Sequence, residues 1–171
     1  MIDALKRRRR RNEMASRLCM AVSQRAREAA FYRQYGVADT IDGRFDLVAL
    51  HAWPVLECLL ESGEKVLAQG FVDALFARFE DALREQGAGD IGMSRRMTKM
   101  ASAFYGRLRA YSESVDEAQL AAAILRNVYR GESGRVDRAA SLAKYIDVVR
   151  RDIAGAGLAS GELQFGPIPA P

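Results

Sequence analysis

The sequence predicts an all-α protein, a single-domain bundle of about six helices with short loops. Only four prolines occur in 171 residues, and three of them crowd the last five positions, so the interior holds almost no helix breaker. Apolar residues recur at intervals of three and four, the period of an amphipathic helix. No segment shows the sustained alternation of a half-buried strand.

Length and composition are typical of one globular domain with a real core. Hydrophobic residues make up 49% of the chain and charged residues 28%, which argues against disorder. We divide the chain into a basic N-terminal arm (1–11), a helical domain (12–154) and a flexible, exposed tail rich in Gly and Pro (155–171).

The first predicted helix covers residues 12–35 and ends at Gly36, a favourable residue after a helix. The stretch "GVADTIDGRFD" follows, and its Asp, Thr and Gly residues predict a structured loop. A second helix is expected over 45–60. Pro54 lies inside this helix, so it either kinks the helix or begins a new one after Trp53.

Four more helices follow, each with one apolar face. The segment "GAGDIG" separates the third from the fourth, which Asp90 or Ser94 can cap. Asp116 is a suitable cap for the fifth. These helices are expected at about 64–86, 90–111, 116–131 and 137–153.

Positive charge gathers at the front of the chain. Residues 1–33 carry ten Lys and Arg against three Asp and Glu, whereas residues 34–171 carry sixteen against nineteen. Such an arm suits an anionic membrane surface or nucleic acid such as ribosomal RNA, or it is merely a solvated start. The arm's cations are Lys6, Arg7, Arg8, Arg9, Arg10 and Arg11.

Other features bear on the compartment. Cys19 and Cys58 lie far apart inside helical patterns, which indicates a reducing compartment and no disulfide framework. No apolar run approaches the ~20 residues that span a bilayer. The N-terminus lacks the apolar region of a secretory signal, and its slight likeness to a mitochondrial presequence is also that of an ordinary helix.

No enzymatic motif stands out. His51 is the one histidine. Asp46 lies about one helical turn before it and Val55 one turn after it, so no catalytic triad on one helix face is visible and a helix-packing role is favoured. One His and two separated Cys are a poor zinc set. Phosphate-binding motifs are absent. Glu57 and Glu61 share a helix face that is more often solvated than catalytic. We therefore expect no catalytic residue, metal or cofactor.

Methionines form a stripe at Met93, Met97 and Met100. Such a stripe is usually core, although Met-rich helices also line surfaces that accept irregular apolar partners.

Two stretches, "FYRQYGVADTIDGRFDLVALHAW" and "LREQGAGDIGMSRRMTKMASAFYGRLRAY", resemble the ubiquinol–cytochrome c chaperone family. The resemblance is strong over residues 31–111 and looser in the later helices. Pro54 departs from the aliphatic residue expected after Trp53. Composition and compact size favour a bacterial member.

The resemblance implies a helical, non-enzymatic assembly factor that holds newly made cytochrome b, or its assembly intermediate, for the ubiquinol–cytochrome c reductase. It also implies a ribosome contact and a small helical partner protein. The expected location is cytoplasmic and peripheral at the inner membrane, or the mitochondrial matrix in a eukaryote. For the client-binding residues we expect His51, Trp53, Met100, Phe104, Tyr105 and Arg107.

Two other functions remain open at this point. The basic arm allows a ribosome- or nucleic-acid-binding module, and the lone His allows an enzyme. Three outcomes would separate these functions. Capture of cytochrome b would favour the assembly factor, and capture of RNA or ribosomal proteins would favour the binding module. A turnover that depends on His51 would favour the enzyme.

Overall fold

The structure is a computed structural model that describes residues 2–85, 87, 89–156, 158 and 162–171. Within these residues the chain forms seven α-helices, a short 3-10 helix (Ser133–Arg135) and no strand. Six of the α-helices are long, which confirms the prediction of an all-α bundle of about six helices. The α-helices are α1 (Ile2–Arg25), α2 (Ala29–Arg33), α3 (Ile41–Glu61), α4 (Lys65–Glu85), α5 (Asp90–Ser112), α6 (Glu117–Val128) and α7 (Val136–Ala156).

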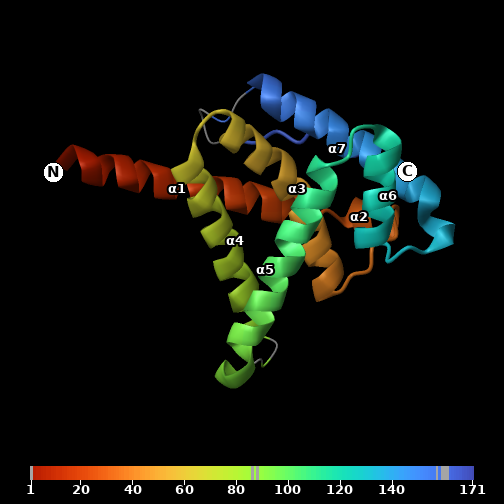
Figure 1. The fold of residues 1–171 in the computed structure, drawn as a ribbon, viewed down its shortest axis with the longest axis horizontal. Coiled ribbons are helices and arrows are strands. Elements are labelled where there is room, and N and C mark those ends of the chain that lie inside the picture. The colour runs from red at the N-terminus through yellow and green to blue at the C-terminus, as the bar shows by residue number, and fades with distance from the viewer. Residues whose placement is uncertain (1, 86, 88, 157, 159–161) are drawn as a thin grey trace.

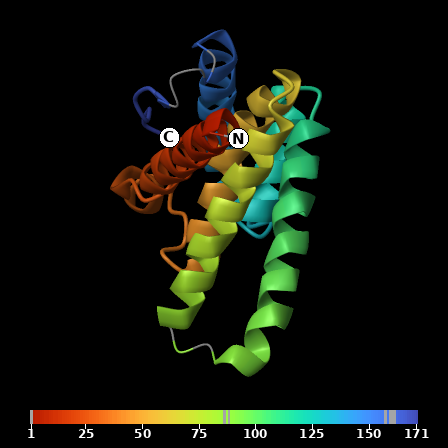
Figure 2. The ribbon, with the colours of Figure 1, turned by 90° about the vertical axis from the view of Figure 1, so that its left-hand side faces the viewer.

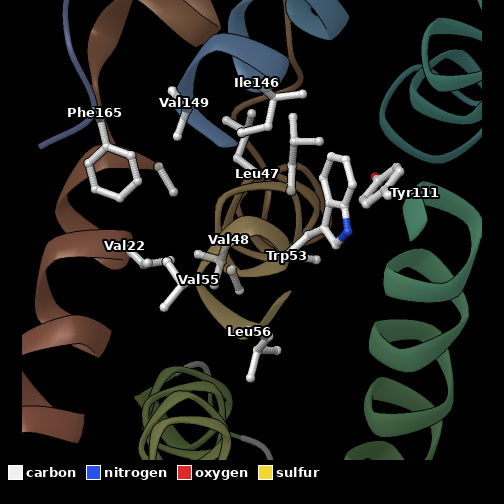
Figure 3. Close-up of a cluster of buried hydrophobic side chains, with 14 of the residues drawn as sticks. Val22, Leu47, Val48, Trp53, Val55, Leu56, Tyr111, Ile146, Val149 and Phe165 are labelled. Atoms are coloured by element: carbon white, nitrogen blue, oxygen red, sulfur yellow. The ribbon is translucent and has the colours of Figure 1, made fainter. Parts of the chain in front are cut away.

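Helix α3 is the centre of the bundle. It packs against α1, α4, α5, α6 and α7 (Figures 1 and 2), and all of its residues from Phe45 to Leu56 are buried. Figure 3 shows how its side chains spread outward, with Val55 directed toward α1, Leu56 toward α4 and Trp53 toward Tyr111. A helix that is apolar on every side must be enclosed, and this one is.

Helices α4 and α5 run antiparallel, and the end of α4 and the start of α5 extend beyond the rest of the bundle (Figure 2). Helix α1 packs along α4, and α6 pairs with α7 on the opposite side of the molecule. The two sides of α5 therefore face different neighbours: α4 on one side and α6 on the other.

The predicted first helix is wrong at both ends. Helix α1 already begins at Ile2, so the basic arm is helical. Residues 3–13 of this helix are exposed. Arginine is a good helix former, and an exposed ion pair between Arg9 and Glu13 (2.9 Å) supports the helix. The helix ends at Arg25 instead of residue 35, and the Tyr32 hydroxyl donates to the carbonyl of Ala26 at this break.

Two glycines explain the turn that leads into α3. Gly36 has a φ of +66°, and a Cβ there would collide with the guanidinium of Arg135. At Gly43 a Cβ would collide with the carbonyl oxygen of Ala38. The backbone N–H of Gly43 donates to Oγ1 of Thr40 (3.1 Å), which caps α3. The expected structured loop is confirmed, and the helix begins four residues earlier than predicted.

Helix α3 continues through Pro54 as one element, so no new helix begins after Trp53. Pro54 has no N–H to donate to the carbonyl four residues earlier. Because neighbouring helices enclose this part of α3, packing offsets the missing hydrogen bond.

The expectation of an exposed tail is wrong for Leu158 and Phe165, which are both buried. The guanidinium of Arg25 donates to the carbonyl of Gly166 (2.7 Å), and the Tyr35 hydroxyl donates to that of Pro169 (2.9 Å). Gly and Pro indicate that a helix has ended, but they do not show whether the following segment packs on the core, as this one does through two buried side chains and two hydrogen bonds.

Candidate client-binding surface

The six residues expected to bind a client do not share one surface. His51, Trp53 and Phe104 are buried in the core. Tyr105 is 51% exposed, and it lies on the side of α5 that faces α4. Met100 and Arg107 line a separate groove on the side that faces α6. The buried residues can only support a surface from behind.

His51 belongs to a chain of hydrogen bonds inside the core. Its Nδ1 donates to the carbonyl of Leu47 (2.7 Å), and its Nε2 accepts from the Tyr145 hydroxyl (3.0 Å). The Tyr145 hydroxyl in turn accepts from Nε of Arg25 (2.7 Å). Burial lowers the pKa of His51 to about 4, so the ring is neutral at neutral pH. The helix-packing interpretation of this histidine accounts for both of its nitrogens.

An apolar groove of about 510 Å³ runs between α3, α4 and α5. We call it the apolar groove. Glu57, Glu61 and Lys65 are its charged lining residues, and Glu61 and Lys65 are exposed. Its apolar lining consists of Trp53, Leu56, Leu60, Ala68, Val72, Tyr105 and Leu108.

Two large apolar side chains in this groove are open to solvent. Leu60 is 54% exposed and Tyr105 is 51% exposed, and they come from different helices, α3 and α5. Single exposed apolar residues need no explanation, but two that share a groove with an apolar lining form a patch. The groove therefore offers an apolar partner a place to bind.

The wall of the apolar groove is held in place by Trp53. Its Nε1 donates to Oγ of Ser112 on α5 (3.0 Å). The guanidinium of Arg150 lies 5.4 Å from the centroid of its ring and also pairs with Glu57 (3.0 Å). A surface fixed in this way loses little conformational entropy when a partner binds.

A second groove, of about 500 Å³, lies between the start of α3, α5 and α6. We call it the basic groove. Phe45, Met100 and Ala103 are among its apolar lining residues. Its cationic lining residues are Arg96, Lys99, Arg107, Arg126 and Arg130.

Arg107 is a structural residue as well as a lining residue. Its guanidinium contacts Oδ1 of the fully buried Asp46 through Nε (2.8 Å) and Nη2 (2.7 Å). Arg130 lies 2.8 Å from Oδ2 of the same carboxylate. Burial raises the pKa of Asp46 to about 6, although the two guanidinium groups act to lower it. Arg107 thus compensates a buried charge, which the sequence prediction overlooked.

The cations of the arm, Lys6 to Arg11, are all exposed. Arg7, Arg10 and Arg11 face a hollow that also includes Met14 and Leu59. The remaining side chains project from the helix into solvent. The arm is therefore helical in this structure, and its positive charge is distributed around the helix axis.

The described part of the chain contains neither a candidate membrane-spanning helix nor a candidate metal-binding cluster. None of its helices is long and apolar enough to cross a membrane. None of its His, Cys, Asp and Glu side chains gather in threes or more so as to hold a metal ion.

Sequence reasoning missed Leu60 and Asp46. Leu60 follows the helical phase of its neighbours, so nothing in the sequence marks it as exposed. Asp46 did carry a signal, because it is the one charge in the apolar run "FDLVAL". A carboxylate in such a run calls for a buried cationic partner.

A protein-family model described as "Ubiquinol-cytochrome C chaperone" matches residues 33–165. The crystal structure of the Cbp3 homolog from Brucella abortus is similar, with a TM-score of 0.84, 32% sequence identity and 98% of each chain covered. No curated protein sequence matches the chain.

Proposed function

The chain belongs to the ubiquinol-cytochrome C chaperone family, and we propose that it binds newly made cytochrome b through the apolar groove. The family and the similar Cbp3 homolog support an assembly-factor role. The single observation that supports the binding site is the pair of exposed apolar side chains, Leu60 and Tyr105, in one groove.

A membrane subunit that has not yet been inserted has a specific need. Its spanning helices are apolar over ~20 residues, and they aggregate in water unless a partner covers them. A helix laid into a groove between other helices is a common way to cover such a face. The apolar groove between α3, α4 and α5 has the right lining for this contact, and the ring and hydroxyl of Tyr105 suit a boundary between apolar client and water.

The charged residues of the groove support its use as a binding surface. Glu57, Glu61 and Lys65 line the groove together with its apolar residues. Polar rims around apolar centres are typical of protein interfaces and keep the free protein soluble. We expect these charges to set the orientation of the client and the apolar lining to set its affinity.

We propose a non-enzymatic role. The lone histidine is fully buried and both of its ring nitrogens are occupied, so a substrate does not reach it in this conformation. The proposal would be abandoned if the purified chain showed a turnover that His51→Gln abolishes.

Capture of cytochrome b from membranes tests the proposal. A tagged chain with Leu60→Ser and Tyr105→Ser should recover much less cytochrome b than the unchanged chain. The matched control is Val136→Ser with Val148→Ser, because these residues are also about half-exposed but lie on α7. The control should retain full capture. Equal recovery by the two double variants, both folded, would place the client elsewhere.

The exposed basic arm supports a second contact, with an anionic membrane surface. We propose that the protein associates peripherally with the inner membrane through Lys6 to Arg11. The ribosome is the alternative partner for this arm, and a small helical protein is a further expected partner. Recovery of ribosomal proteins that depends on the arm would favour the ribosome.

A further inference from the structure

The basic groove carries positive charge that the described residues do not fully neutralise. Its lining has five cationic side chains against one acidic residue, Asp42, with the buried Asp46 behind. Arg107 and Arg130 are paired with Asp46. In the part of the chain that the structure describes, Arg96, Lys99 and Arg126 have no acidic partner. Three free cations therefore meet over one hollow.

The groove is apolar beneath these charges. Phe45, Met100, Ile41, Leu83 and Ala103 contribute to its lining. A volume of about 500 Å³ falls within the range of roughly 300–1,000 Å³ that is typical of small-molecule sites. A site for a nucleic-acid backbone would need the cations without this lining, because phosphate contacts are polar. The combination fits a ligand that has both an apolar part and a negative charge.

The site is also organised before any ligand arrives. Asp46 holds the guanidinium groups of Arg107 and Arg130 in place, and Arg130 also donates to the carbonyl of Asn127. Cations whose positions are already fixed lose less entropy on binding than free side chains do. Arg107 and Arg130 thus supply a fixed positive field, and the three unpaired cations are left to contact the ligand.

We propose that the basic groove binds a small amphiphilic anion, with its apolar part on Phe45 and Met100 and its carboxylate or phosphate held by Arg96, Lys99 and Arg126. This inference is independent of the client proposed above, because the apolar groove lies on the other side of α5.

Calorimetric titration of the full chain tests the proposal with four probes: decyl phosphate, decanoate, inorganic phosphate and decanol. Decyl phosphate and decanoate are used below their critical micelle concentrations. We expect decyl phosphate or decanoate to bind, and inorganic phosphate and decanol to bind at least tenfold more weakly. Whichever of decyl phosphate and decanoate binds more tightly shows whether the groove prefers a phosphate or a carboxylate headgroup. Since each exposed charge contact is individually weak, Arg96→Gln with Lys99→Gln should raise the dissociation constant about tenfold.

The matched control is Arg95→Gln with Arg109→Gln, which removes the same charge from α5 outside the groove. It should leave binding unchanged. Met100→Gln should weaken binding of decyl phosphate but not of inorganic phosphate. Three results would each overturn the proposal. The first is an equal loss of binding in the control pair, and the second is equal affinity for inorganic phosphate and decyl phosphate. The third is binding of an acidic deca-glutamate peptide without any binding of decyl phosphate or decanoate.

Discussion

The hydroxyl of Tyr145 on α7 donates to Nε2 of His51 on α3 across 3.0 Å. With Arg25 of α1 at one end and the carbonyl of Leu47 at the other, this contact joins three helices through one polar chain in the core. Phe165 covers it from outside, with its ring centroid 5.6 Å from that of His51. A buried polar chain is tolerated when every member has a partner, and here each has one.

His51 should make stability depend on pH. Its pKa is lowered from 6.5 in the unfolded chain to about 4 in the fold, so below pH 6.5 the unfolded chain binds more protons. The stabilisation is fully present above pH 6.5 and is lost as the pH falls from 6.5 toward 4. For each unit by which the pH falls in this window, the contribution of His51 to the free energy of unfolding should decrease by about 1.4 kcal/mol.

Urea unfolding at several pH values measures this dependence against His51→Gln, which has no titrating ring. Asp46 titrates in both proteins, so its contribution cancels in the difference. The raised pKa of Asp46 gives a slope of opposite sign in both proteins. The prediction therefore concerns the difference: as the pH falls from 6.5 to 4, the unchanged chain should lose stability relative to the variant by the amount above. Parallel curves would show that His51 is not buried as a neutral group.

Arg107→Met should destabilise the protein strongly. The change leaves the carboxylate of Asp46 buried with only Arg130 beside it. Removing one partner of a buried ion pair costs roughly 3–5 kcal/mol, and the remaining guanidinium favours the lower value. The control is Arg109→Met, two positions along α5, where the arginine pairs with Glu113 in solvent. The urea midpoint of the Arg109→Met variant should equal that of the unchanged chain. If both variants unfold at similar urea concentrations, the role given to Arg107 is wrong.

Phe165→Ala should destabilise the protein by roughly 3 kcal/mol, the lower end for an emptied aromatic site. The ring packs on His51 and lies 5.7 Å from the guanidinium of Arg25. Pro167→Ala is the control, since that side chain is exposed two residues later. Thermal melting of the two variants measures the difference. If both melt like the unchanged chain, the tail does not pack on the core.

Replacing Arg7 to Arg11 with Gln should weaken binding to anionic vesicles and leave the melting temperature nearly unchanged. Each basic residue near such a surface adds ~1 kcal/mol, whereas the exposed arm contributes little burial to the fold. Gln keeps helix propensity close to that of Arg. Vesicle flotation at low salt measures the binding, with Arg95→Gln and Arg109→Gln as the control. Retention of binding by the arm variant would argue for another membrane contact.

Helix count and order could be predicted from the sequence because they depend on local periodicity. The five later helices begin and end within a few residues of the expected positions. The errors lie where tertiary contacts decide. The break after Arg25 depends on what packs around Ala26, and the burial of Phe165 depends on a distant helix.

The site was harder to predict than the fold. Residues of one helix can lie on different sides of it, and Tyr105 and Arg107 are only two positions apart on α5, yet they face different grooves. The helical phase of a residue shows on which side of its helix it lies, but not which neighbouring helix packs against that side. Leu60 is a candidate because α3, α4 and α5 together form the groove in which it is exposed, and this arrangement is a tertiary feature.

The central position of α3 has a consequence for how the protein is made. Residues 41–61 are synthesised early, but α7 and Phe165, which cover one side of them, come from the last part of the chain. Until about residue 165 has left the ribosome, this face of α3 lacks its cover. During its own synthesis, this protein therefore exposes an apolar helix that waits for a later segment, which is the same hazard that an assembly factor relieves in its client.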